Sequence, residues 1–427
     1  MKNEKTVEKT VRLGLCVSCG ICKAACPQGA IRLDYTRGQY CPVVLEKCNL
    51  CGLCLKVCPG IEIRFADFNK NKIINISNDL ILGPVINAYI CFTKDKKIRN
   101  IATSGGVITS LIIELLNSKN YQGAFVLPFT EASTNLQKTI YTNDIETIMS
   151  ASKSKYLPAS VENVIEHLKK IKTSSIVVGT PCQIYGIKKY MKTSGIQDSN
   201  TLFLGLFCDK TLNYNALNYF ECIYGKGRKI KKFEYRSKEK DGWPGHTKIV
   251  FDNKEELFVH RKVRMELKKF FQLKRCLFCL DKFNRLADIS FGDCYIPGKE
   301  SILGKSNIIV RTEKGLNALN YSNNIVLEEI DPNYIVSSQK LNQKNQNLTF
   351  AKIFEINNGH CIYPEYENKK YIDKKIYKTF YRHQKYIEYG RNVKKFKFIS
   401  YLIKYYNIKK FVTKVFKRIG NIFGVKQ

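Results

Sequence analysis

The sequence predicts an α+β domain rich in cysteine over residues 1–70, an α/β domain over residues 83–335, and a basic helical tail over residues 366–427. Three observations support this division. Nine of the 17 cysteines lie within the first 70 residues. From residue 83 to about 333, short β-branched runs alternate with amphipathic segments, which is typical of an α/β domain. From Lys369 to Gln427, 18 Lys or Arg residues stand against 2 acidic residues.

The overall composition is that of a globular protein. Of the 427 residues, 44% are hydrophobic and 25% are charged, which excludes wholesale disorder and fibrous structure. No uninterrupted apolar run reaches the roughly 18 residues of a membrane-spanning helix. The chain starts without the apolar core of a secretory signal, so we expect a cytoplasmic protein. In that reducing compartment, 17 cysteines favour metal binding over disulfides.

One cysteine spacing occurs twice near the N-terminus. Cys16-x2-Cys19-x2-Cys22-x3-Cys26 is repeated 32 residues later as Cys48-x2-Cys51-x2-Cys54-x3-Cys58, and a proline follows each motif. This is the spacing of bacterial two-cluster ferredoxins, in which the fourth cysteine of each motif binds the other cluster. Residues 1–70 are therefore predicted to form a ferredoxin-like dicluster domain. The predicted ligands are Cys16, Cys19, Cys22 and Cys58 for one 4Fe-4S cluster, and Cys48, Cys51, Cys54 and Cys26 for the other.

A pair of zinc sites is the alternative for these cysteines. Zinc sites usually combine paired Cys-x2-Cys units or include histidine, and none of the five histidines lies near the motifs. The spacing therefore favours iron–sulfur clusters. Cys41, between the two motifs, is predicted to be a small buried residue and not a ligand.

Apolar periodicity assigns the elements of the α/β domain, which we divide into residues 83–160 and 161–335. Apolar stripes predict helices over 107–116 and 161–168, the second capped by Ser160. The predicted strands are 124–127, 175–178, 202–207, 248–251, 289–291 and 307–310. The turn Ala102-Thr103-Ser104-Gly105-Gly106-Val107 precedes the first helix and would offer free backbone amides to an anion. The same turn would also serve as an ordinary helix cap, so both interpretations stay open.

Four further segments accompany this turn: residues 152–158 (SKSKYLP), 178–183 (VGTPCQ), 205–208 (GLFC), and 275–279 (RCLFC) leading to 287–293 (ADISFGD). In this order they resemble the beta subunit of coenzyme F-420 hydrogenase/dehydrogenase, a family of iron–sulfur flavoproteins, over residues 83–330. The segment 304–312 resembles the family's late strand. The resemblance implies an α/β flavin-binding domain that holds FAD. It places the FAD phosphates at Thr103, Ser104, Gly105, Gly106 and Val107, and the flavin ring nearer Ser154, Lys155 and Tyr156.

Four cysteines, Cys182, Cys208, Cys276 and Cys279, lie inside these segments. A third 4Fe-4S cluster would use all four, because a flavin that accepts a hydride needs a one-electron centre nearby. The alternatives are a redox thiol at Cys182, a zinc site at Cys276 and Cys279, or plain packing. The remaining cysteines, Cys91, Cys222, Cys294 and Cys361, are interpreted as structural. His246 is a candidate for the wall of a substrate pocket.

The tail predicts an amphipathic helix over residues 411–423, with an apolar face and Lys or Arg on the other faces. Such a helix would bind an anionic membrane surface at the inner face of the membrane, or pack its apolar face on the flavin domain or a partner. Nucleic acid is disfavoured, because the aromatic side chains share the apolar face and do not alternate with basic residues.

Together these observations predict an iron–sulfur flavoprotein oxidoreductase that passes electrons between 4Fe-4S clusters and FAD. It would exchange a hydride with an organic partner, either coenzyme F-420 or a substrate of a polysaccharide pathway. The alternative is a non-catalytic electron-transfer subunit of a larger hydrogenase or dehydrogenase. The expected partners are a redox protein or a small-molecule hydride acceptor, and no catalytic residue is assigned.

Overall fold

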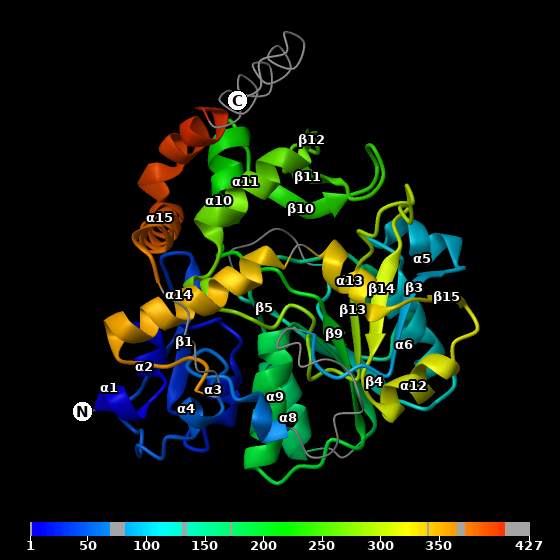
Figure 1. Ribbon diagram of the computed structural model, residues 1–427, viewed down its shortest axis with the longest axis horizontal. Helices are drawn as coiled ribbons and strands as arrows, with labels where there is room; N and C mark the ends of the chain where they lie inside the picture. Colours follow the sequence, from blue (N-terminus) through cyan, green and yellow to red (C-terminus); the bar gives the residue numbers. More distant parts are fainter. Residues whose placement is uncertain are drawn as a thin grey trace.

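The computed structural model describes residues 2–68, 82–129, 135–170, 173–339, 341–364 and 372–405. Figure 1 shows the cysteine-rich N-terminal domain beside the helices of a large α/β domain, and a smaller sheet with its own helices at one end of the molecule. The predicted helix over 411–423 lies outside the described residues. Within the described ranges, no helix is both long enough and apolar enough to span a membrane.

The N-terminal domain is built of short elements. They are α1 (Lys2–Lys5), α2 (Glu8–Arg12), α3 (Ile21–Ala25), β1 (Ile31–Thr36), β2 (Gln39–Val44), α4 (Leu53–Lys56) and the 3-10 helix η1 (Phe65–Phe68). β1 and β2 form an antiparallel hairpin, which pairs Ile31 with Val44 at its open end. Short helices with few apolar side chains are expected where metal ligands replace part of a hydrophobic core.

An eight-stranded mixed sheet forms the centre of the α/β domain, in the order β15-β3-β14-β13-β9-β8-β4-β6. Its strands are β3 (Asn87–Thr93), β4 (Gly123–Val126), β6 (Ile140–Thr142), β8 (Ser175–Gly179), β9 (Thr201–Leu206), β13 (Ile289–Asp293), β14 (Ser306–Val310) and β15 (Ile325–Glu329). β4, β8, β9 and β13 run parallel to one another, whereas β14, β3, β15 and β6 each pair antiparallel with their neighbours. A further two-stranded sheet pairs β5 (Gln137–Lys138) with β7 (Ala159–Ser160).

Helices cover both faces of this sheet, as the alternation of its side chains requires. The core on one face joins Ala124 and Val126 of β4 to α6 (Val107–Asn117) and α12 (Glu313–Asn320). The core on the other face joins Phe125 to α8 (Glu162–Lys170) and α9 (Pro181–Thr193). The remaining helices of the domain are α5 (Lys96–Ile101), α7 (Ile145–Ser150) and α13 (Pro332–Ser338).

A three-stranded antiparallel sheet stands apart from the large one, in the order β10-β11-β12 (Figure 1). Its elements, with the helices beside it, are α10 (Asn215–Tyr224), β10 (Ile230–Ser237), β11 (His246–Phe251), β12 (Glu256–Val259), α11 (Arg261–Phe271) and η2 (Lys274–Leu277). The last described elements are α14 (Asn342–Asn358), α15 (Lys374–Gly390), η3 (Val393–Lys395) and a helix described to residue 405. In this described part of the tail, the buried residues Phe396, Ile399 and Ile403 pack on α10 and α11.

All six predicted strands occur, but 248–251 belongs to the small sheet and not to the large one. Apolar periodicity missed β3, β15 and the α10–α11 region as a separate unit. β15 has one buried residue, Ile325, followed by half-buried or exposed positions, so it carries little apolar signal.

We predict that Gly186→Val destabilises the contact between α9 and the N-terminal domain. A Cβ atom at Gly186 would lie 2.5 Å from Ile21 Cδ1 and 3.2 Å from Pro59, and overpacking costs about 1–3 kcal/mol. Anaerobically purified variant should therefore have a lower Tm than wild type. Ser194→Val, at an exposed position at the end of the same helix, is the control and should change Tm little. An unchanged Tm for Gly186→Val would contradict this tight contact.

Candidate iron–sulfur and cofactor site

The two cysteine motifs adopt the same backbone turn. Ser18 and Leu50, each two residues after the first cysteine of its motif, have positive φ angles of 58° and 60°. This conformation aims each amide back at that cysteine, so Ser18 N–H donates to Cys16 Sγ at 3.4 Å and Leu50 N–H donates to Cys48 Sγ at 3.4 Å. Backbone donors at sulfur are typical of iron–sulfur sites, where they tune the reduction potential.

Glycine follows in both motifs with the same conformation. Gly20 and Gly52 each have φ of 74° and start α3 and α4. α3 carries Cys22, α4 carries Cys54, and Val7 N–H donates to Cys54 Sγ at 3.3 Å. The repeat seen in the sequence is therefore also a repeat of backbone geometry.

The thiols are grouped across the two motifs. Burial raises the pKa of Cys19, and the nearby Cys58 raises it further. Burial likewise raises the pKa of Cys22, and Cys19, Cys58 and Cys54 add to that effect. Thiols that lie this close together can bind one cationic metal cluster. The placement of Cys19, Cys22 and Cys58 therefore fits the first predicted ligand set.

In the second predicted ligand set, the fourth cysteine likewise comes from the other motif. Burial raises the pKa of Cys54 to about 11, and both Cys48 and Cys26 contribute to the rise. Cys51 is exposed at the surface of the domain. Cys41 differs from its prediction, because it is half-buried and its thiol hydrogen-bonds Cys16, which lowers the pKa of Cys41.

The N-terminal domain meets the α/β domain at its cysteines. Val161 N–H donates to Cys19 O at 2.9 Å, and Lys23 Nζ lies 3.1 Å from Glu162 Oε2. The thiol of Cys182 is close enough to contribute to the raised pKa of Cys19. The first ligand set therefore faces the cysteines of the α/β domain across this contact.

Those cysteines come together at the end of the parallel strands. Burial raises the pKa of Cys182 to about 12, and Cys279 and Cys276 add repulsion. Thr211 N–H donates to Cys276 Sγ at 3.4 Å, and Cys208 N–H donates to Lys282 O at 2.9 Å. Among the described residues, no three Cys, His, Asp or Glu side chains are grouped as ligands of a single metal ion. A raised pKa at Cys182 argues against a reactive thiolate there.

A cavity of about 1040 Å³ lies at the carboxyl ends of the four parallel strands. Each of these strands contributes a residue at or near its carboxyl end to the wall: Val126, Gly179, Leu206 and Phe291. In α/β sheets this edge is the usual place for ligands. Cys182 and Cys208 also line the cavity, and Val17 of the N-terminal domain reaches it.

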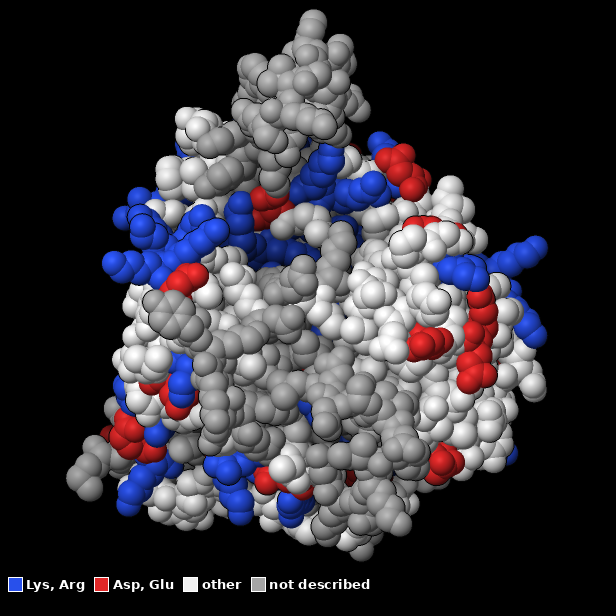
Figure 2. Space-filling view, in the orientation of Figure 1, with Lys and Arg blue, Asp and Glu red and all other residues white. Residues whose placement is uncertain are grey.

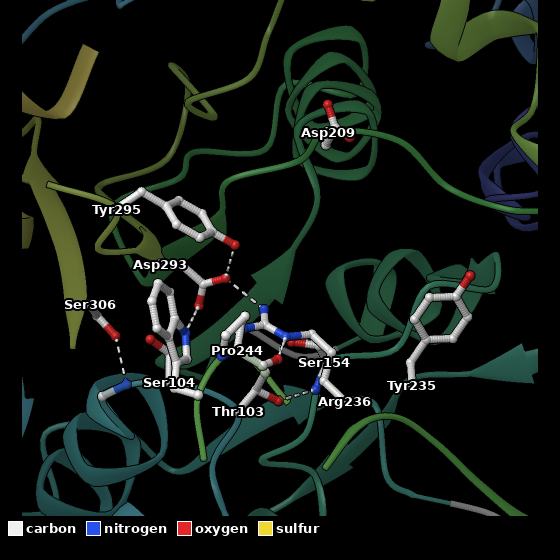
Figure 3. Close-up of polar contacts among 12 residues, drawn as sticks. Thr103, Ser104, Ser154, Asp209, Tyr235, Arg236, Pro244, Asp293, Tyr295 and Ser306 are labelled. Atoms are coloured by element: carbon white, nitrogen blue, oxygen red, sulfur yellow. Dashed lines mark hydrogen bonds and ion pairs between the residues drawn. The ribbon is translucent and has the colours of Figure 1, made fainter. Parts of the chain in front are cut away.

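The two segments predicted to hold FAD meet in this cavity (Figure 3). Ser154 N–H donates to Thr103 Oγ1 at 2.9 Å, which ties one segment to the other. The predicted residues that line the cavity are Thr103, Ser104, Gly106, Val107, Ser154, Lys155 and Tyr156. Gly105 turns away, and its N–H donates to Ser306 Oγ at 3.1 Å.

The start of α6 is open to a ligand. Gly106 has φ of 76°, and no side chain caps the helix there. A Cβ atom at Gly106 would also lie 2.8 Å from Thr93 Cγ2, so this position requires glycine on two grounds. The cavity and the uncapped amides suit a phosphate-bearing cofactor, since ligand pockets measure about 300–1,000 Å³.

Lys155 and Tyr156 differ in their surroundings. Burial, together with Lys153, lowers the pKa of Lys155 to about 7, and its Nζ donates to Ala151 O at 2.6 Å. Tyr156 stacks on Tyr235 of β10, with ring centroids 4.3 Å apart. The small sheet therefore contributes directly to the wall of the cavity.

Sequence reasoning missed the ion pair at the centre of this wall. Arg236 Nη1 lies 2.6 Å from Asp293 Oδ2, Arg236 Nε donates to Pro244 O at 2.9 Å, and Tyr295 OH donates to Asp293 Oδ2 at 3.0 Å (Figure 3). Burial alone would raise the pKa of Asp293, but Arg236 and these hydrogen bonds hold the pKa below its usual range. Asp293 ends the ADISFGD segment, whereas Arg236 lies in a stretch without any motif.

One minor prediction is wrong. His246 does not line the cavity, because its Nε2 lies 2.8 Å from Asp241 Oδ2 and its Nδ1 accepts from Arg261 N–H. The local sequence carries no information about the direction in which this side chain points. Cys222 is exposed, whereas Cys91 and Cys294 are buried, and the interpretation of these cysteines as structural stays a prediction.

The prediction that the fourth cysteine of each motif binds the cluster of the other motif can be tested by substitution. We predict that Cys58→Ser alters the same reduced-cluster signal as Cys16→Ser, and that Cys26→Ser alters the same signal as Cys48→Ser. Electron paramagnetic resonance of dithionite-reduced protein would measure these signals. Cys222→Ser is the matched control and should leave both unchanged. If Cys58→Ser instead reproduced the spectrum of Cys48→Ser, this prediction would be refuted.

Comparison with known proteins agrees with this division of the chain. Residues 15–60 match the model of the 4Fe-4S dicluster domain. Residues 88–166 match the N-terminal region of the coenzyme F-420 hydrogenase/dehydrogenase beta subunit, and residues 173–333 match its C-terminal region. In a solved structure of the F-420-reducing NiFe hydrogenase complex from Methanosarcina barkeri, one chain aligns with a TM-score of 0.51 at 20% identity, over 68% of this chain and 100% of that one.

Curated relatives point the same way. The coenzyme F-420-dependent sulfite reductase of Methanocaldococcus jannaschii is 25% identical over 77% of this chain, which spans only 50% of that protein. The coenzyme F-420 hydrogenase subunit beta of Methanococcus voltae is 26% identical over 52% of this chain and 75% of its own length. The chain therefore belongs to the coenzyme F-420 hydrogenase/dehydrogenase beta-subunit family, and it carries a 4Fe-4S dicluster domain in front of the family's two regions.

Proposed function

We propose that the chain is an iron–sulfur flavoprotein oxidoreductase that passes electrons between its 4Fe-4S clusters and FAD bound in the cavity. FAD would then exchange a hydride with an organic donor or acceptor. Bound FAD supplies the conversion between a hydride, which carries two electrons, and single electrons. The relatives named above are F-420-dependent enzymes or subunits, which supports an oxidoreductase.

The contact between the two domains near Cys19 and Cys182 carries this proposal: Val161 N–H donates to Cys19 O at 2.9 Å, and the Cys182 thiol contributes to the raised pKa of Cys19. Cys19 belongs to the first predicted ligand set, and Cys182 lines the cavity. Arg275 lies beside the same contact, where its Nε donates to Gly60 O at 2.8 Å and its charge acts on Cys279 and Cys182. The predicted cysteine ligands therefore lie in succession from the N-terminal domain to the wall of the cavity.

We further propose a third 4Fe-4S cluster at Cys182, Cys208, Cys276 and Cys279. Cys276 and Cys279 contribute to the raised pKa of Cys182, and the backbone N–H of Cys208 donates to Lys282 O. The FAD phosphates would be held by Thr103, Ser104, Gly106 and Val107, with Gly105 supporting the turn. Ser154, Lys155 and Tyr156 would lie nearer the flavin ring, where the lowered pKa of Lys155, about 7, would let its amine release and take up a proton near neutral pH.

Metal and flavin analysis tests the proposal directly. Protein purified without oxygen should contain FAD and about 12 irons per chain, because three 4Fe-4S clusters hold four irons each. Replacing Cys276 and Cys279 together by serine should lower the count to about 8 irons and leave the dicluster signals in place. A wild-type count of about 8 would remove the third cluster, and protein without flavin would overturn the flavoprotein assignment.

The second candidate is a non-catalytic electron-transfer subunit of a larger complex. The name of the Methanococcus voltae relative, a hydrogenase subunit, favours this candidate. Dithionite-reduced protein separates the two. Reoxidation by a small hydride acceptor, such as coenzyme F-420 or a nicotinamide, supports the enzyme. Reoxidation by a partner subunit alone supports the electron-transfer subunit.

A further inference from the structure

The cavity wall carries more positive than negative charge. Nine basic residues line it against three acidic ones, Asp209, Glu266 and Asp293. The basic residues are Lys153, Lys155, Lys210, Arg236, Arg261, Lys262, Arg264, Lys268 and Lys282. Figure 2 shows Lys and Arg side chains gathered around a hollow on this face of the molecule. Such an excess favours anionic ligands.

Two of these charges are buried side by side. Arg236 is 6% exposed and Arg264 is 4% exposed. The charge of Arg236 contributes to the lowered pKa of Arg264, after burial as the main cause, so the two guanidinium groups repel each other. Arg264 Nη1 donates to Tyr235 O at 2.6 Å, which fixes its position without neutralising it. The carboxylate beside this pair is Asp293, and one carboxylate leaves one of the two charges uncompensated.

One donor of this pair has no partner among the residues that the structure describes. Nη1 of Arg236 binds Asp293 and Nε binds Pro244 O, but Nη2 is buried and has no hydrogen-bond partner in the described part of the chain. Leaving a charged donor buried and unsatisfied is costly, so such groups in a cavity wall point to a ligand atom.

We infer that Arg236 and Arg264 form an anion subsite of the cavity, which binds a phosphate group through Arg236 Nη2. The planar guanidinium suits a phosphate oxygen, and the uncapped start of α6 supplies further donors across the same cavity. Ser104, in the turn before α6, lies near both: its hydroxyl donates to Lys305 O at 2.6 Å, and it contributes to the lowered pKa of Asp293. This inference rests on the proposed function of the cavity and adds a recognition element that no motif predicted.

Two molecules carry the chemistry that this subsite requires. One is FAD, through its diphosphate. The other is a phosphorylated organic substrate that exchanges the hydride. The diphosphate of FAD carries about two negative charges, so most of the basic side chains in the wall remain for a second anion.

The test uses the anaerobically purified full chain with Arg236→Gln and, as control, Lys231→Gln. Lys231 is exposed on the same strand, lies outside the cavity wall and loses the same charge. Inorganic pyrophosphate is the probe, with binding measured by calorimetry and flavin measured against iron. Loss of a charged hydrogen bond should weaken pyrophosphate binding by roughly 10- to 100-fold in Arg236→Gln and leave Lys231→Gln unchanged.

The source of the phosphate follows from the flavin content. A lower flavin-to-iron ratio in Arg236→Gln assigns the subsite to FAD, whereas retained flavin with weakened pyrophosphate binding assigns it to the substrate. Retained flavin with unchanged binding overturns the inference, as does an equal effect in Lys231→Gln. Iron content is read in every sample, so failure of the iron–sulfur proposal is seen separately.

A second variant tests the same subsite in the opposite direction. Asp293→Asn keeps the shape of the side chain but removes the carboxylate that competes with phosphate for Arg236. Pyrophosphate should bind this variant more tightly than wild type. If Arg236→Gln does not fold, this measurement still decides, because unchanged or weaker binding in Asp293→Asn would contradict the subsite.

Discussion

The arrangement of the whole molecule depends on the contact between α3 and the helices α8 and α9. Glycine allows this contact, because a Cβ atom at Gly20 would lie 2.1 Å from Ser160 Oγ, and Gly186 lies against Ile21 and Pro59. The backbone bond from Val161 to Cys19 and the ion pair of Lys23 with Glu162 fix the same surface. This contact brings Cys19 of the N-terminal domain close to Cys182 in the wall of the cavity.

The cavity combines two architectures with different roles. The carboxyl ends of the parallel strands supply the glycine turn and the cysteines, as expected for the ligand edge of an α/β sheet. The small sheet and α11 close the cavity from the other side and supply Arg236, Arg264 and Lys268. Stacking of Tyr156 on Tyr235 joins the two parts. Both parts lie within the regions that match the family, and the second part supplies five of the nine basic side chains of the wall.

Burial disfavours the charged form of the side chains in both sites. Buried thiols have raised pKa values because burial and neighbouring thiols disfavour the thiolate, and burial together with the charge of Arg236 lowers the pKa of Arg264. A ligand of opposite charge would favour the charged form in each case. The proposed metal clusters and the proposed phosphate would each supply that opposite charge.

The sequence by itself determined the dicluster domain, because cysteine spacing along a short chain fixes which thiols reach one cubane. It also predicted the six strands, since apolar runs act locally. The segments Thr103–Val107 and Ser154–Tyr156 came from the family resemblance, and their binding of FAD stays a prediction. Only the tertiary structure decided that Cys19 lies beside Cys182, that Arg236 pairs with Asp293, and that His246 turns away from the cavity. These are contacts between segments from 5 to 163 residues apart, and the direction of a side chain follows from the packing around it, which no local pattern encodes.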